Sequence, residues 1–368
     1  MALISITELA ALAADALRAS GASETMARVT AKYLVVAESQ GLATHGVMRV
    51  PSYCGHLKSG RANGAAAPRI VNEKPAACLI DAGNGLGFEP CEFAIGQAIE
   101  RASQHGIGFA GVTNSHHCGA LGILLEPVAA AGMVGLAFSN APAAIMAWGG
   151  KRPLLGTNPV AAVFPREKWR ADSLPAAPAV RGQRAQALAA TSDCSANEEW
   201  RGPPLVIDLS LTQVTRGQIM LLAKEGKPIP EGWGMDKDGN PTTDAQKILV
   251  GGSLYAVGGL KGTMLALAVE LLCCALTGAA LSHEVESMHT SDGPPLRLGQ
   301  AFLAVDPAAL AGSDVYFESV ETLIAAMLED DDTRLPGDRR HALAARAAKD
   351  GIEVNADLEK QLRELARR

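Results

Sequence analysis

The sequence is poor in aromatic residues, which make up 4% of its 368 positions, and it has no surplus of positive charge. Its 33 Lys and Arg residues are outnumbered by 39 Asp and Glu residues, which leaves a net charge of −6. Proteins that bind nucleic acids usually carry a basic excess or a basic stripe, so no nucleic-acid partner is expected. The chain also has no uninterrupted apolar run of about 18 residues, so no membrane span is expected.

Disulfide and zinc-site patterns are absent as well. The seven cysteines are odd in number and show no CxxC spacing, which favours free thiols over a disulfide framework or a zinc site. The start of the chain lacks a basic segment ahead of an apolar stretch, so no signal peptide is expected. Together these features predict a cytoplasmic protein without a metal centre.

The two common nucleotide-binding fingerprints, the P-loop and the GxGxxG motif, are also missing. The nearest glycine cluster, at residues 83–87, has the wrong spacing, and no clean helix is expected directly behind it. Phosphate binding at such a loop needs backbone amides at a helix N-terminus. The cluster is therefore interpreted as a turn that requires glycine backbone angles.

What the chain has is apolar sequence, 48% of its residues, which is enough for a sizeable core. Residues 5–40 show helical periodicity, with Ser5 and Ser23 as expected N-caps. From residue 69 onward, short β-like runs alternate with helical stretches, which is typical of an α/β core. The β-like runs are 77–81, 107–113, 135–140, 158–164 and 205–209.

The second half of the chain differs in composition and periodicity. Residues 166–204 are rich in Ala, Pro and Arg and lack periodicity, which predicts a surface insertion. Residues 212–224 and 261–280 are expected to be helices, and residues 316–329 and 341–368 are expected to be helical and charged.

A first candidate site lies at Thr44, His45 and Arg49. A histidine has an unperturbed pKa that suits proton transfer near neutral pH, and an arginine offers a planar fork to a carboxylate. The alternative interpretation is a helix cap at Thr44, a surface histidine and an arginine in a salt bridge. The pattern alone leaves both open.

Two further candidates follow β-like runs. His116 and His117 come just after one run, where ligands of α/β sheets bind, and one of them is a candidate substrate or cofactor contact. Two adjacent histidines do not easily face one metal ion. Asp208 ends another run and either caps the following helix or orients a histidine.

Lys261 follows Gly258 and Gly259 at the start of a long apolar helix. The helix dipole and free amides favour an anion there, so Lys261 is a candidate contact for a phosphate or a carboxylate. The tight turn at residues 155–159 leads into a strand and is explained by turn chemistry alone.

Taken together, these segments resemble one family, the type-2 malate/L-lactate dehydrogenases. They occur in the family's order and cover nearly the whole chain apart from residues 166–204. Each segment alone is weak evidence, and the ordered set carries the resemblance. The segments are 44–46 with Arg49 and Tyr53, 114–117, 156–159, 208–210, 229–233 with 241–244, 258–262 and 335–340.

The resemblance implies an α/β fold that binds a nicotinamide cofactor in a way unlike the Rossmann fold, with helical N- and C-terminal segments. It implies an NAD(P)-binding domain at residues 69–299, and helical substrate and dimer segments at 1–68 plus 300–368. A homodimer acting on a small 2-carboxylate substrate is expected.

The resemblance also implies a relay of Thr44, His45 and Asp208, in which His45 donates the proton and Asp208 orients it. Thr44 departs from the family pattern, which usually has Ser there, and adds a methyl group that restricts χ1. Implied substrate contacts are Arg49, His117 and Lys261. Implied cofactor contacts are Arg49, Val50, Pro51, Ser52, Tyr53, Thr157, Asn158, Phe164, Pro165, Arg166, Leu209, Ser210, Lys261, Gly337, Asp338 and Arg339.

Within the family, the chain looks most similar to the Δ1-piperideine-2-carboxylate/Δ1-pyrroline-2-carboxylate reductases. The expected activity is reduction of a cyclic imine 2-carboxylate to L-pipecolate or L-proline with NADPH, NADH being possible. Arg166 is the candidate partner for the 2′-phosphate, with a plain surface arginine as the alternative. Two other interpretations stay open: a 2-hydroxyacid dehydrogenase of the malate, lactate, sulfolactate or ureidoglycolate type, and a non-catalytic relative that binds the cofactor.

Overall fold

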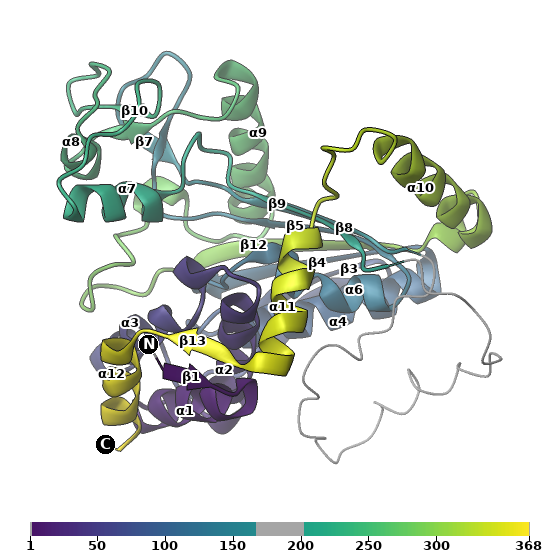
Figure 1. Ribbon diagram of the computed structural model, residues 1–368, viewed down its shortest axis with the longest axis horizontal. Coiled ribbons are helices and arrows are strands. Elements are labelled where there is room, and N and C mark those ends of the chain that lie inside the picture. Colours follow the sequence, from purple (N-terminus) through teal and green to yellow (C-terminus); the bar gives the residue numbers. More distant parts are fainter. Residues whose placement is uncertain (1, 167–201, 368) are drawn as a thin grey trace.

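The computed structural model describes residues 2–166 and 202–367 (Figure 1). The insertion predicted at about 166–204 lies almost wholly outside the described residues. A seven-stranded mixed sheet forms the centre of the fold. In spatial order its strands are β2 (Arg69–Lys74), β3 (Ala77–Asp81), β4 (Ile107–Ser115), β12 (Leu298–Val305), β5 (Val134–Ser139), β8 (Val160–Phe164) and β9 (Leu205–Leu209).

β12 is the middle strand of this sheet, although it is the last of the seven in the sequence. It pairs antiparallel with β4 on one side and with β5 on the other, whereas β3 and β4 run parallel. Most residues of β4 and β12 are buried, as expected for apolar strands that are covered on both faces. The strand order confirms a mixed α/β fold.

Helix α4 (Phe88–His105) packs on one face of the sheet, against β4 and β12. It begins directly after residues 83–87, so the expectation that no clean helix follows this glycine cluster was wrong. The turn interpretation itself is confirmed, because Gly83 has a φ of +57°. A Cβ on Gly87 would lie 2.5 Å from the carbonyl oxygen of His116, so this glycine allows two backbone segments to pack closely.

The N-terminal helices α1 (Ile6–Ala19) and α2 (Glu24–Ser39) begin where the sequence predicts. The hydroxyl of Ser5 accepts from the backbone N–H of Glu8 at 3.1 Å, and the hydroxyl of Ser23 accepts from that of Met26 at 3.2 Å. Both are N-cap bonds, each of which satisfies a donor that the helix leaves free. Helix α3 (Val50–Ser59) follows and carries Tyr53 and His56 in its buried face.

The C-terminal segment returns to these helices (Figure 1). Helix α10 (Ser313–Met327) is followed by α11 (Asp338–Asp350), β13 (Ile352–Val354) and α12 (Ala356–Ala366). The prediction of helical structure throughout 341–368 was therefore wrong in one place. Gly351, with a φ of +89°, ends α11, and β13 pairs with β1 (Ala2–Ile4), which no local pattern in either segment reveals.

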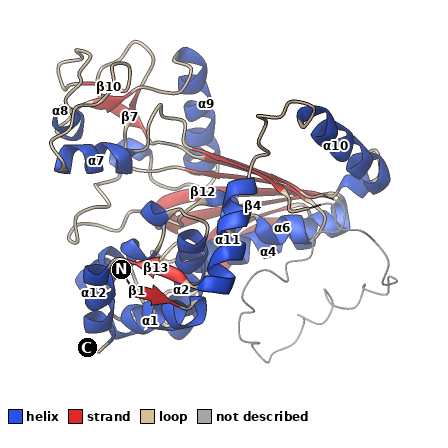
Figure 2. Cartoon of the chain, in the orientation of Figure 1, coloured by secondary structure: helices blue, strands red, loops and turns tan. Residues whose placement is uncertain are grey.

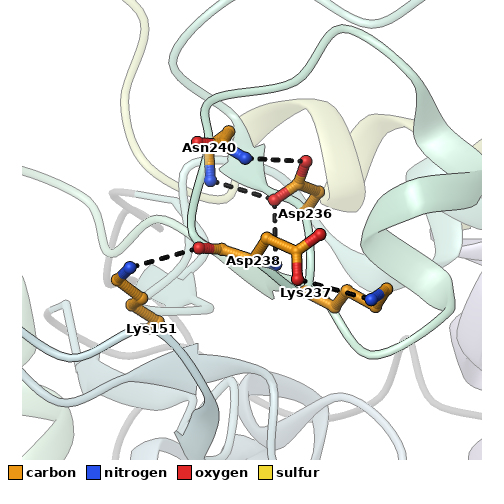
Figure 3. A network of polar contacts seen from close by, with 5 residues as sticks. All are labelled: Lys151, Asp236, Lys237, Asp238 and Asn240. Carbon is orange, nitrogen blue, oxygen red and sulfur yellow. Dashed lines mark hydrogen bonds and ion pairs between the residues drawn. The ribbon is translucent and has the colours of Figure 1, made fainter.

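A smaller four-stranded sheet carries its own helices beside the central sheet (Figure 2). Its strands are β10 (Gly234–Met235), β11 (Ser253–Leu254), β6 (Ile145–Met146) and β7 (Pro153–Leu155), and its helices are α7 (Arg216–Lys224), α8 (Ala245–Leu249) and α9 (Leu260–Glu270). The turn after β10 is held by Asp236, whose carboxylate accepts from the backbone N–H groups of Asp238 and Asn240 at 3.0 and 2.9 Å (Figure 3). Lys151 donates to the carbonyl of Asp238 at 3.3 Å and ties this turn to the loop before β7.

Helix α9 continues into a π turn at Leu271–Ala275, in which Cys273 and Cys274 are buried core residues. Its outer face is apolar and exposed, with Leu265 56% and Leu271 50% accessible. In the part of the chain that the structure covers, no helix is both long and apolar enough to cross a lipid bilayer.

Candidate active site

A cavity of about 410 Å³ lies where the segment before α3, the ends of the central strands and the start of α7 meet. Of the side chains predicted from the sequence, it brings together Thr44, His45, Arg49, His117, Thr157, Asp208 and Ser210. These residues are spread from position 44 to position 210 of the chain. The fold thus gathers the predicted catalytic residues around one cavity.

His45 lies in a short 3-10 turn (Ala43–His45) between α2 and α3. Its Nδ1 is 3.1 Å from the hydroxyl of Thr44, and its ring stacks on the ring of His117 with centroids 5.7 Å apart. Burial, followed by the positive charge of Arg49, lowers the pKa of His45 to about 4, whereas the charge of Asp208 opposes this shift. In the free protein His45 is therefore neutral at pH 7.

Thr44 is tolerated because its methyl group faces a glycine. A Cβ on Gly217, in the first turn of α7, would lie 3.6 Å from the Thr44 Cγ2. The threonine methyl therefore packs against the helix start while the hydroxyl stays on His45.

Asp208, in β9, is anchored by two donors on a single oxygen. Its Oδ2 accepts from the backbone N–H of Gly122 at 3.2 Å and from the guanidinium of Arg340, in α11, at 3.0 Å. The alternative role as a helix cap is not observed, because the hydroxyl of Thr215 caps α7 by accepting from the N–H of Gln218 at 3.2 Å. Asp208 acts on His45 electrostatically, because its negative charge raises the pKa of the imidazole.

The walls of the cavity are strongly basic. They contain three guanidinium groups, from Arg49, Arg216 and Arg340, and one carboxylate, from Asp208. Arg340 is paired with Asp208, and Arg49 donates from Nε to the carbonyl oxygen of Thr44 at 2.7 Å. Among the described residues, neither Arg49 nor Arg216 forms an ion pair with a carboxylate. Two positive charges are thus left to meet negative groups of a ligand.

A loop that the sequence analysis did not single out supplies another wall, with Ser287, Met288 and His289. Arg61 holds this loop in place. It is 1% exposed and donates to the carbonyl oxygens of Ser287 and Thr290 at 2.9 and 2.6 Å. Arg61 also donates to the hydroxyl of Thr290 at 2.9 Å, and its other acceptors are backbone carbonyls, which leave no side-chain pattern in the sequence. Arg216 and Arg340 were missed as well, and only their positions near predicted helix starts signalled them.

Other predicted residues lie outside the cavity lining. Val50 and Tyr53 are buried in α3, next to Pro51 and Ser52. Asn158 is buried too, and its side-chain amide donates to the carbonyl oxygen of Ala266 and to the carboxylate of Glu270, both at 2.8 Å.

The remaining predicted cofactor residues lie at the end of β8, in β9, at the start of α9 and at the N-terminus of α11. Phe164, Pro165 and Arg166 lie at the end of β8, and the guanidinium of Arg166 forms a bidentate pair with Glu321 of α10, at 2.9 and 2.8 Å. Lys261 is exposed at the start of α9, and Leu209 is 59% exposed. Gly337, Asp338 and Arg339 lie at the N-terminus of α11 beside Arg340.

The chemistry of the lining fits a nicotinamide cofactor together with an acidic substrate. The hydroxyls of Thr157 and Ser210 line the same cavity as His45 and can hold an amide, and the guanidinium groups of Arg49 and Arg216 suit carboxylate or phosphate oxygens. The family model for malate/L-lactate dehydrogenase matches residues 4–200 and 172–363. The chain belongs to the malate/L-lactate dehydrogenase family. It is an NAD(P)-dependent oxidoreductase, and the sequence-based expectation of this family and cofactor class is confirmed.

Individual relatives act on different substrates. The chain is 41% identical to the (2R)-3-sulfolactate dehydrogenase (NADP(+)) of Chromohalobacter salexigens, over 93% of this chain and 91% of that one. It is 33% identical to the Δ1-pyrroline-2-carboxylate/Δ1-piperideine-2-carboxylate reductase of Pseudomonas syringae pv. tomato, over 94% and 91%. The crystal structure of the Δ1-piperideine-2-carboxylate reductase from that organism superposes with a TM-score of 0.85 at 30% identity, over 99% of this chain and 100% of that one. The family is shared, and the substrates differ between its members.

Proposed function

We propose that this enzyme interconverts a 2-oxo acid and the corresponding 2-hydroxy acid with NADP(H), and that its substrate carries a second anionic group, a sulfonate or a carboxylate. The observation that carries the proposal is the pair of guanidinium groups, on Arg49 and Arg216, that have no carboxylate partner among the described residues of the cavity. The name of the 41% identical relative, a 3-sulfolactate dehydrogenase that uses NADP(+), supports both the dianionic substrate and the cofactor.

In this proposal His45 is the proton donor for the 2-oxo oxygen during reduction. The hydroxyl of Thr44 orients its ring, and the negative charge of Asp208 favours its protonated form. A nicotinamide, when bound, supplies the hydride that carbon 2 receives. The low pKa of His45 in the free protein comes from burial and positive charge. A bound dianion offsets the positive charge, so substrate binding raises the pKa of His45 toward the working pH and prepares it to donate.

Arg49 and Arg216 would each hold one anionic group of the substrate, and His117 would contact the oxygens nearest His45. The predicted cofactor contacts, including Lys261 and residues 337–339, would bind the nicotinamide cofactor. Arg166 would have to exchange Glu321 for the 2′-phosphate of NADPH. The division into residues 1–68 plus 300–368 and residues 69–299 stays a prediction.

We also propose a homodimer. The exposed leucines of α9, its π turn and the residue after it, among them Leu265, Leu271 and Leu276, form an apolar face of the kind that subunits bury against each other.

Reduction of a cyclic imine 2-carboxylate is the second candidate function. It is supported by the 33% identical reductase and by the TM-score of 0.85 with the solved reductase structure. In that reaction His45 would protonate the ring nitrogen. A cyclic imine acid carries one carboxylate, so it would leave Arg216 without a partner.

The deciding experiment follows the loss of nicotinamide absorbance with purified protein. NADPH and NADH are each offered with 3-sulfopyruvate, oxaloacetate, pyruvate, Δ1-piperideine-2-carboxylate and Δ1-pyrroline-2-carboxylate. Turnover of a dianionic 2-oxo acid, at least tenfold above pyruvate in kcat/KM, is expected. Preference for a cyclic imine would replace the proposal by the second candidate, and cofactor binding without turnover of any acid would contradict both.

The role of His45 has its own test. We expect His45→Gln to lower kcat by roughly 10²–10⁴-fold while the affinity for the cofactor is kept, because general acid catalysis contributes that much. The exposed His283, changed to Gln, is the matched control. Unchanged turnover by His45→Gln would contradict the mechanism for either substrate class.

A further inference from the structure

We propose that Tyr53 is a positioning residue that fixes the tautomer of His117, so that His117 always presents its Nε2–H to the cavity. The tautomer follows from the structure alone, whereas its kinetic consequence rests on the proposed function. Tyr53 lies in α3 and is fully buried, and its hydroxyl is 2.6 Å from Nδ1 of His117. No other hydrogen bond of this hydroxyl is found among the described residues.

Which of the two groups donates in this hydrogen bond is decided by whether each proton has an acceptor. If Nδ1–H of His117 donated, the hydroxyl proton of Tyr53 would be buried without an acceptor, which costs about 1–3 kcal/mol. If the hydroxyl donates, every donor in the pair has a partner. Burial also raises the pKa of Tyr53, so its proton is retained. The Tyr53 hydroxyl is therefore the donor, and Nδ1 of His117 is the acceptor.

The surroundings of Tyr53 leave its ring little freedom. The ring packs edge-on against Phe88, with centroids 6.1 Å apart, and against His116, with centroids 5.5 Å apart. A buried ring held on two sides keeps its hydroxyl at one place. The bond to His117 is thus set by the packing of α3.

The consequence for the site is a neutral donor beside the catalytic acid. Nε2 of His117 has no partner among the described residues, and the residue lines the cavity next to His45. With Nδ1 occupied, the single ring proton is on Nε2 and points to the ligand. A second proton would have to displace the bond to Tyr53. His45 is therefore the ring of this stacked pair that takes up a proton.

The electrostatics around His117 act in the same direction. The titratable and charged groups that face it are Arg49, His45, His116, His289 and Tyr53. Burial and then Arg49 lower the pKa of His117 well below its usual value. None of these groups supplies a negative charge that would favour the imidazolium.

The tautomers of His56 and His116 follow from the same reasoning, and these two residues serve as internal references in the test. Nε2 of His56 must donate to the carbonyl oxygen of Thr290 at 2.9 Å, so its Nδ1 accepts from Nε2 of His116 at 2.8 Å. Both rings therefore carry their proton on Nε2 as well.

The direct test is a long-range ¹H–¹⁵N correlation spectrum of histidine-labelled full-length protein near pH 7, with His117 assigned by its loss in His117→Gln. The expected pattern is an unprotonated Nδ1 and a protonated Nε2. In Tyr53→Phe, His117 should become a mixture of its two neutral tautomers, whereas His56 and His116 keep their proton on Nε2. A protonated Nδ1 in the wild-type protein would overturn the proposal. So would a His117 pattern that Tyr53→Phe leaves unchanged.

The kinetic test separates positioning from a purely structural role. In Tyr53→Phe, KM for the acid should rise about tenfold at pH 8, because a hydrogen bond of ordinary strength is lost. kcat should change much less than KM, because His45, the proton donor, keeps its own contact with Thr44.

Tyr33→Phe is the matched control, since Tyr33 is also buried against Phe88 but bonds to Glu92 at 3.2 Å, away from the cavity. It should leave KM and kcat unchanged. A KM that Tyr53→Phe leaves unchanged, or a fall of kcat as large as the rise of KM, would overturn the positioning role. The spectrum needs no substrate, so failure of the proposed function leaves it a valid test of the tautomer.

Discussion

Arg340 and the backbone of Gly122 donate to the same oxygen of Asp208, at 3.0 and 3.2 Å. The second oxygen, Oδ1, has no protein donor among the described residues. The carboxylate is thus fixed on one side by α11 and by the start of α5 (Leu121–Leu124), while the other side can act on the cavity. Asp208 and Arg340 act on His45 with opposite signs, since Asp208 raises its pKa and Arg340 lowers it.

The first prediction uses this opposition. During reduction His45 must be protonated, so kcat/KM falls as pH rises through its pKa. Arg340→Gln removes a positive charge and should move this limb to higher pH, and Asp208→Asn should move it to lower pH. The measurement is the pH profile of kcat/KM. Arg346→Gln, an exposed change of the same kind in α11, is the control. Shifts of the two variants in one direction would contradict the assignment.

The second prediction concerns the second anionic group of the substrate. Arg216→Gln should raise KM for a dianionic 2-oxo acid by roughly 10–100-fold, because a hydrogen bond to a charged group is lost. KM for pyruvate, which has one carboxylate, should change much less. Lys224→Gln, at the exposed end of the same helix, controls for net charge. Equal effects on both acids would mean that Arg216 does not select the second charge.

The third prediction concerns Arg166 and Glu321, whose side chains are only 11% and 12% exposed. Arg166→Met leaves the carboxylate of Glu321 buried and unpaired, and it should lower the free energy of unfolding by about 3–5 kcal/mol. Adding Glu321→Leu should recover most of this loss. Denaturant unfolding measures both. A double variant as unstable as the single one would show that the loss is not due to the unpaired charge.

The same two variants decide what Arg166 does for the cofactor. If Arg166 binds the 2′-phosphate, both variants lose the preference for NADPH over NADH in KM. If the pair is structural, this ratio stays at the wild-type value in the double variant.

The fourth prediction is a loss of stability in acid. The pKa values of His45 and His289 are lowered to about 4 and that of His116 to about 3, from 6.5, mainly by burial. Between these values and pH 6.5 the unfolded chain binds more protons than the folded chain. The free energy of unfolding therefore falls as pH drops below 6.5, by up to about 1.4 kcal/mol per pH unit for each histidine.

Denaturant unfolding at several pH values between 7.5 and 4.5 tests this, without ligand. His116→Gln should reduce the slope against pH, whereas His283→Gln, at an exposed position, should leave it unchanged. A slope that His116→Gln leaves unaltered would assign the acid sensitivity to other groups.

Much of the local structure was predictable because its causes are local. The caps at Ser5 and Ser23 act within three residues, and the strands at residues 77–81 and 205–209 follow from short apolar runs. The helix predicted for 341–368 failed at β13, because pairing with β1 depends on a segment at the other end of the chain.

The sequence by itself determined the family, the mixed α/β fold and the identity of the proton-donor candidate, since caps, strand runs and ordered motifs are properties of short segments. Only the tertiary structure decided which partners meet. Arg340 reaches Asp208 from 132 positions away, Arg61 holds a loop more than 220 positions away, and Tyr53 bonds to His117 across 64 positions. Such contacts depend on how helices and strands pack on one another, and a charge or a ring proton at one residue is set by whatever that packing brings beside it.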